Sequence, residues 1–251
     1  MRHPRDCRGF TLIELMIALM IALVAMLAAT ELYVGTKQTY RIQGMQMRLS
    51  EDGRFALSML QRMISQAGFR PNPSALIAAD FITPTSSQSV TLKFTADGAN
   101  TIACDGSLPA LDSVQTITIA KTGSKLQCGA VDWIAPAAAG AGQGTELVDF
   151  RLDYGSDTGP ATPKDFGCGA DVGANKERDC VADSYLQATA TANPTKIVAV
   201  KVCLVLRSEA IDGGIAKAAA VKDCSAIDIA GSDSDNKLYR TFRSTVLLRN
   251  R

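Results

Sequence analysis

The chain has 251 residues, 47% hydrophobic and 20% charged, and a formal net charge of +1. This length and apolar content suffice for one or two globular domains with a substantial core, and the near-neutral charge gives no argument for a nucleic-acid partner. The single histidine, His3, lies in the short segment before the first apolar run. If that segment is removed, the rest of the chain has no histidine, which excludes Ser-His-Asp catalysis, Cys-His catalysis and most zinc sites. We therefore expect a non-enzymatic protein without a cofactor.

The first predicted element is an apolar helix over residues 10–29, preceded by a basic leader over residues 1–9. At about 1.5 Å per residue such a helix spans roughly 30 Å, the thickness of the hydrocarbon core. The excess of arginine in the leader places the leader in the cytoplasm and the rest of the chain beyond the membrane. The helix contains one charge, Glu14. A carboxylate inside a bilayer costs about 2.5–3.5 kcal/mol and normally has a partner, although an acid near the interface can also be tolerated by protonation or by reaching water.

The run "RGFTLIELMIALMIALVAM" resembles the N-terminus of type IV prepilins and pseudopilins, in which a short basic leader ends in glycine, here Gly9. The resemblance implies that prepilin peptidase cleaves after Gly9 and methylates the new amino terminus of Phe10. It also implies that Glu14 pairs with the amino terminus of a neighbouring subunit and so sets the register of assembly. The alternative is an ordinary secretory signal cut near Ala29, for which "AATELY" is a weak match.

Residues 30–68 are predicted to continue as an amphipathic helix that packs on a globular head. Its apolar stripe consists of Leu49, Ala56, Leu60, Met63 and Ala67. Gly68 is predicted to stop the helix. Gly35, Gly44 and Gly53 each weaken a helix by roughly 1 kcal/mol relative to alanine, and they mark either bends or solvent-facing positions.

Residues 69–251 are predicted to form a β-rich head beyond the membrane. Alternating apolar residues predict strands over Val90–Thr95, Val114–Ala120, Leu147–Tyr154, Lys196–Arg207 and Leu238–Arg249. Their hairpin-like spacing favours an antiparallel sheet packed on the long helix, which is an α+β fold.

Six cysteines follow the apolar run, and none is in a CxxC pair. This pattern favours disulfides formed in an oxidising compartment over redox chemistry or a zinc ribbon. Six cysteines allow many pairings, among which proximity in the chain suggests three: Cys104–Cys128, Cys168–Cys180 and Cys203–Cys224.

Two polar clusters are candidate binding sites. Asp228, Asp233 and Asp235 have the alternating oxygens of a weak calcium candidate, but Lys237 stands where a calcium loop needs glycine, so a solvated turn is the stronger interpretation. Near the C-terminus, Arg243, Arg249 and Arg251 share one face of the predicted last strand and Arg240 lies opposite. A solvated face is favoured there over contact with nucleic acid or acidic pilins.

Two further stretches, "LSEDGRFALSMLQRMISQAGFR" and "YRTFRSTVLLRNR", resemble the PilW family of minor pilins. The resemblance covers both ends of the chain and leaves the middle unassigned. It implies a type IV pilin-like fold and assembly with other minor and major pilins through an inner-membrane assembly platform. The protein would reside in the bacterial inner membrane as a single-pass protein with a periplasmic head before assembly, and in the extracellular pilus afterwards.

Three functions therefore remain open at the level of sequence. The first is a minor pilin of the priming or tip complex, supporting twitching motility, adhesion or DNA uptake. The second is a pseudopilin of a type II secretion system, which the same N-terminus would serve. The third is a membrane-anchored domain that binds a ligand or an adhesive target.

Overall fold

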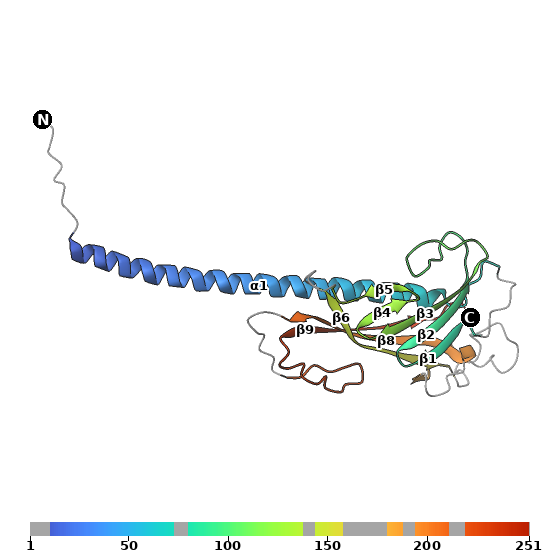
Figure 1. Cartoon of the computed structure of the whole chain (residues 1–251). Coiled ribbons are helices and arrows are strands. Elements are labelled where there is room, and N and C mark those ends of the chain that lie inside the picture. Colours follow the sequence, from blue (N-terminus) through green and yellow to red (C-terminus); the bar gives the residue numbers. More distant parts are fainter. Residues whose placement is uncertain are drawn as a thin grey trace. The chain divides into compact units, whose positions relative to one another are not determined.

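The computed structural model describes residues 11–72, 80–137, 144–157, 180–187, 194–210 and 219–250. Within these residues one α-helix is followed by nine β-strands and one short 3₁₀ helix. The chain divides into two compact units, Met1–Gly44 and Met45–Arg251. The second unit, called the head below, contains the end of the helix and all the strands (Figure 1).

Helix α1 runs without a break from Leu12 to Gln66. It ends as the sequence predicts, because Gly68 adopts a positive φ of 75° that only glycine takes readily. The N–H of Gly68 then donates to the carbonyl of Lys93 at 2.9 Å, which joins the helix end to the first sheet. A Cβ at Gly68 would lie 2.0 Å from the carbonyl oxygen of Asn250, so glycine is also required by space.

The nine strands form two antiparallel sheets where the sequence analysis expected one. The first has the order β1-β2-β3-β4-β5. Its strands are β1 Ile82–Ser86, β2 Ser89–Thr95, β3 Val114–Thr122, β4 Lys125–Cys128 and β5 Val131–Ile134. The second has the order β7-β6-β8-β9. Its strands are β6 Thr145–Ser156, β7 Ser184–Leu186, β8 Ile197–Ala210 and β9 Lys237–Leu247, and the 3₁₀ helix η1, Pro194–Lys196, precedes β8.

The five predicted strands are all present as β2, β3, β6, β8 and β9, and the fold is α+β as expected. The strands β1, β4, β5 and β7 were not predicted from the sequence. These strands have three to five residues each, so they contain too few alternations to stand out from irregular chain.

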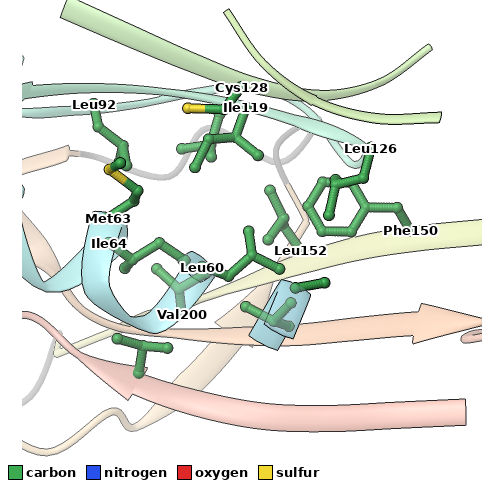
Figure 2. Close-up of a cluster of buried hydrophobic side chains, with 14 of the residues drawn as sticks. Leu60, Met63, Ile64, Leu92, Ile119, Leu126, Cys128, Phe150, Leu152 and Val200 are labelled. Carbon is green, nitrogen blue, oxygen red and sulfur yellow. The ribbon is translucent and has the colours of Figure 1, made fainter. Parts of the chain in front are cut away.

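The core of the head lies where the end of α1 meets both sheets. Figure 2 shows Leu60, Met63 and Ile64 of α1 between side chains of the two sheets. The first sheet contributes Leu92, Ile119 and Leu126, and the second contributes Phe150, Leu152 and Val200. All five residues of the predicted apolar stripe are buried. The stripe is therefore the surface by which α1 holds the two sheets together.

Gly53 has a structural role that neither sequence interpretation anticipated. A Cβ at this position would lie 2.1 Å from the ring of Phe242 on β9. Gly53 therefore allows the close approach of β9 to the helix, and α1 continues through it without a break. At Gly35 and Gly44 a Cβ would meet nothing within 4 Å, so those two positions face open space.

Candidate membrane and assembly segment

The first part of α1 exposes a continuous apolar surface. From Leu12 to Leu27 every large hydrophobic side chain is more than half exposed, for example 77% at Leu12. By length and composition α1 can cross a membrane, and it is the one such helix in the part of the chain that the structure describes. An apolar surface of this size needs a bilayer or other protein chains to cover it.

Glu14 has hydrogen-bond partners within its own helix. Its Oε2 accepts from the backbone N–H of Thr11 at 3.0 Å and from the Thr11 hydroxyl at 2.9 Å. In return, the N–H of Glu14 donates to Thr11 Oγ1 at 3.3 Å. This reciprocal pattern is a capping box, which satisfies donors that a helix start otherwise leaves unpaired. The sequence analysis missed it, although Thr-x-x-Glu before an apolar run is its signature.

Three threonine hydroxyls that follow the apolar run are also hydrogen-bonded within the helix. The hydroxyls of Thr30, Thr36 and Thr39 donate to the carbonyls four residues earlier at 2.8, 2.7 and 2.9 Å. This reduces the penalty for placing these hydroxyls in an apolar environment. Gly9 and Phe10, the predicted cleavage and methylation sites, lie outside the described residues, so both predictions stand untested.

Two disulfides join distant segments of the head. Cys104 and Cys128 are bonded at 2.05 Å, and Cys203 and Cys224 at 2.08 Å. The first joins the segment before β3 to the end of β4. The same segment is also held by Trp133 of β5, whose indole N–H donates to the carbonyl of Cys104 at 2.9 Å. Cys180 is also disulfide-bonded. Its predicted partner, Cys168, lies outside the described residues.

The calcium candidate does not gather into a site. Asp228 forms an ion pair with Lys222 at 3.0 Å, while the Asp235 carboxylate accepts from the Tyr239 hydroxyl and from the N–H of Lys237. Burial raises the pKa of Tyr239, so its hydroxyl stays protonated and donates. Among the described residues no group of three or more His, Cys, Asp or Glu side chains is arranged to hold a metal.

Arg240 and Arg243 lie on opposite faces of β9, as the alternation of side chains along a strand predicts. Arg240 faces α1, where its guanidinium donates to the Ser50 hydroxyl and lies 5.7 Å from the centre of the Phe242 ring. Arg243 and Arg249 are exposed, and Arg251 lies outside the described residues. The structure therefore uses Arg240 to fasten β9 to the helix.

Comparison with known proteins places these features in a family. The family model described as "Type IV Pilus-assembly protein W" matches residues 117–250, more than half of the chain. It includes much of the middle, which the resemblance of the two ends had left unassigned. A second model, "Prokaryotic N-terminal methylation motif", matches residues 4–30, which include most of the leader and the capping box.

A solved structure of a type IV-like pilin from Thermus thermophilus is similar to this chain at 15% identity and a TM-score of 0.44, covering 81% of this chain and 98% of that one. A comparison with curated proteins found no match. The assignment depends on the family model alone, whose match ends in β9 and the residues after it. The chain belongs to the PilW family of type IV pilus-assembly proteins.

Proposed function

We propose that this protein is a minor pilin, a non-enzymatic subunit that prepilin peptidase processes and that joins the priming or tip complex of a type IV pilus. The observation that carries the proposal is the methylation motif at residues 4–30, which leads directly into an exposed apolar helix. Such a helix is suited to two environments in turn, the bilayer before assembly and the packed helices of a fibre afterwards.

The processing step tests the proposal directly. Mass spectrometry of the mature protein, isolated from its own host, should show an N-terminus at Phe10 that is methylated. A chain that still begins at Met1, or that begins near residue 30, would contradict the proposal. The first outcome would mean that the leader is retained, and the second that the apolar helix is an ordinary cleaved signal.

The proposed topology follows from charge. The basic leader stays in the cytoplasm by the positive-inside rule, so the head lies in the periplasm. The disulfides of the head support this side, because disulfides persist in the periplasm and are rare in the cytoplasm. The proposed partners are prepilin peptidase, the inner-membrane assembly platform, and the minor and major pilins that share the fibre.

We further propose that in the fibre Glu14 pairs with the methylated amine of a neighbouring subunit. Its two roles separate experimentally, because glutamine can replace glutamate in a capping box but carries no charge. With Glu14→Gln we expect normal insertion in the membrane and a lower yield of the subunit in sheared fibres. The matched control is Thr11→Ala, which removes the cap hydroxyl and keeps the charge, and whose yield in fibres should stay close to wild type. Equal fibre yields for Glu14→Gln and wild type would contradict the charge pairing.

A type II secretion pseudopilin is the second candidate, since the same processed helix serves that assembly. A deletion strain distinguishes the two, because loss of twitching supports the pilus and loss of protein secretion supports the pseudopilin. A third role, adhesion or ligand binding by the head, is compatible with either assembly.

A further inference from the structure

The head has an open groove of about 600 Å³ between α1 and the end of β9. We call it the α1–β9 groove. One wall is made by Ser58, Gln61, Arg62 and Ser65 of α1, and the other by the last residues of β9 with Arg249 and Asn250 after them. A groove of this volume falls in the range that accommodates a short peptide or a small molecule.

The groove is positively charged. Arg62 and Arg249 are exposed, and none of the described residues that line the groove is acidic. Neither guanidinium is within ion-pair distance of a carboxylate in the described ranges; Arg62 donates only to the carbonyl of Asn100, at 3.3 Å. The other polar side chains of the walls are hydroxyls and amides, which also bind anions or backbone groups. The walls thus favour a negatively charged occupant.

The open edge of β9 borders the same groove. β9 is the last strand of its sheet. The N–H of Leu248 donates to the carbonyl of Val198 on the β8 side at 2.9 Å. Backbone groups alternate along an antiparallel strand, so those of Thr245 and Leu247 point to the open edge. Gln61 reaches β9 through the Ser244 hydroxyl at 2.8 Å, and among the described residues no backbone hydrogen bond from outside the sheet reaches Thr245 or Leu247. An uncovered edge is a template for another extended chain.

The two walls are held in place before any partner binds. In addition to the bond from Gln61 to Ser244, the side-chain amide of Asn250 donates to the carbonyl of Ser65 at 2.7 Å. Val246, whose side chain is 6% exposed, anchors the strand in the core beneath. A preformed groove loses little freedom on binding, which favours affinity.

We propose that the α1–β9 groove binds an extended acidic segment of a partner protein, which adds to β9 as a further strand and places carboxylates beside Arg62 and Arg249. The exposed edge requires an occupant with alternating N–H and C=O groups, which a polypeptide has and a nucleic-acid backbone lacks. The two arginines select acidic side chains on that polypeptide. This proposal concerns the head alone and is independent of processing at Gly9 and of the fibre in which the chain assembles.

Peptide binding to the full chain in detergent micelles tests the proposal by fluorescence anisotropy. The probe is a fluorescein-labelled peptide of the sequence Thr-Asp-Val-Asp-Val-Asp-Thr. A second peptide with Asn in place of Asp tests charge, and a third with N-methylated alternate amides tests strand pairing. We expect both controls to bind at least about tenfold more weakly than the acidic peptide. Equal binding of the three peptides would overturn the proposal, as would tighter binding of a labelled oligothymidylate, which would indicate a general anion site.

A matched pair of double variants places the binding in the groove. Arg62→Gln with Arg249→Gln removes the two groove charges and should weaken the acidic peptide by about tenfold or more. Arg54→Gln with Arg243→Gln removes the same charge from α1 and β9 at exposed positions that do not line the groove, and should leave the affinity within about twofold. Equal losses in the two variants would overturn the proposal, because the effect would then follow net charge.

Discussion

Among single residues, Glu14 shows how an acid is accommodated in an apolar helix. Its carboxylate accepts both donor groups of Thr11, so one carboxylate oxygen is hydrogen-bonded within its own helix before any second chain is present. The proposed pairing with a neighbouring amine would exchange or share these bonds when the subunit leaves the bilayer. The capping box therefore lowers the free-energy cost of holding Glu14 in the bilayer before assembly, and it does not prevent the proposed pairing in the fibre.

Gly68→Ala should destabilise the head more than an ordinary glycine replacement. A non-glycine residue at positive φ costs about 1–2 kcal/mol, and the new methyl group would also meet the Asn250 carbonyl 2.0 Å away. The control is Gly123→Ala, at a φ of 59° with nothing within 4 Å of its Cβ, where only the backbone cost applies. Denaturant unfolding of the full chain in micelles, followed by fluorescence of the single Trp133, measures both. Equal losses would mean that the chain end moves freely away from the helix.

Tyr154→Phe should leave the head as stable or more stable at neutral pH. The side chain is fully buried, and its hydroxyl has no hydrogen-bond partner among the described residues. Removing an unpaired buried hydroxyl eliminates a desolvation cost of about 1–3 kcal/mol.

The same residue predicts a pH dependence. Burial, with a smaller effect from Asp153, raises the pKa of Tyr154 well above its ordinary value. The unfolded state therefore releases this proton near its usual pKa of about 10 and the folded state does not, so stability falls as pH rises above about 10. Tyr154→Phe should weaken that fall in alkaline unfolding curves. A variant that is less stable than wild type at neutral pH would show that the hydroxyl has a bonded role.

Among the elements, β8 is an apolar strand that needs cover on both of its faces. Ten of its 14 residues are buried. Val200, Val202, Leu204 and Leu206 belong to the main core. On the opposite face, Cys203 bonds to Cys224, whose N–H also donates to the Asp149 carboxylate of β6 at 3.0 Å. The segment around Cys224 thus covers β8 and lets a continuous apolar strand lie in the middle of its sheet.

Replacing Cys203 and Cys224 together by alanine should lower the free energy of unfolding by about 3 kcal/mol. The two residues are 21 apart in the sequence. Without the bond, the unfolded chain gains the conformational entropy of a loop of that size, which stabilises the unfolded state by about 3 kcal/mol. The control is the corresponding pair at Cys104 and Cys128, 24 residues apart, which should cost at least as much because Cys128 is fully buried. Denaturant unfolding of the three proteins measures the difference. Unchanged stability in the Cys203 pair would show that the hydrogen bond to Asp149 suffices to hold the segment.

For the whole molecule, the two units predict independent folding of the head. Every residue of the main hydrophobic core lies between Leu49 and Leu248, inside the second unit. A chain that begins at Met45 should therefore fold, remain soluble and keep the Cys104–Cys128 and Cys203–Cys224 disulfides.

A longer deletion provides the contrast. A chain that begins after Ala56 loses Leu49, Gly53 and Ala56, so the packing of Gly53 against Phe242 of β9 is removed. We expect this chain to unfold at clearly lower denaturant concentration, or to aggregate. Circular dichroism and size-exclusion chromatography compare the two chains. Equal behaviour would mean that the apolar stripe before Leu60 contributes little.

Sequence patterns by themselves determined the features that depend on near neighbours in the chain. The apolar helix, the amphipathic stripe, the stop at Gly68 and the five longest strands all repeat or end within a few residues, so local periodicity reveals them. The methylation motif and the two stretches that resemble the PilW family are equally local, so they could be recognised in the sequence.

Only the tertiary structure decided the features built from distant residues. The division into two sheets, the short strands that complete them, and the contact of Gly53 with Phe242 depend on pairing across the chain. The α1–β9 groove places Arg62 beside Arg249, which are at opposite ends of the head sequence. Periodicity shows which face of an element is apolar, but the partner of that face is set by packing among all elements at once, so single elements do not reveal it.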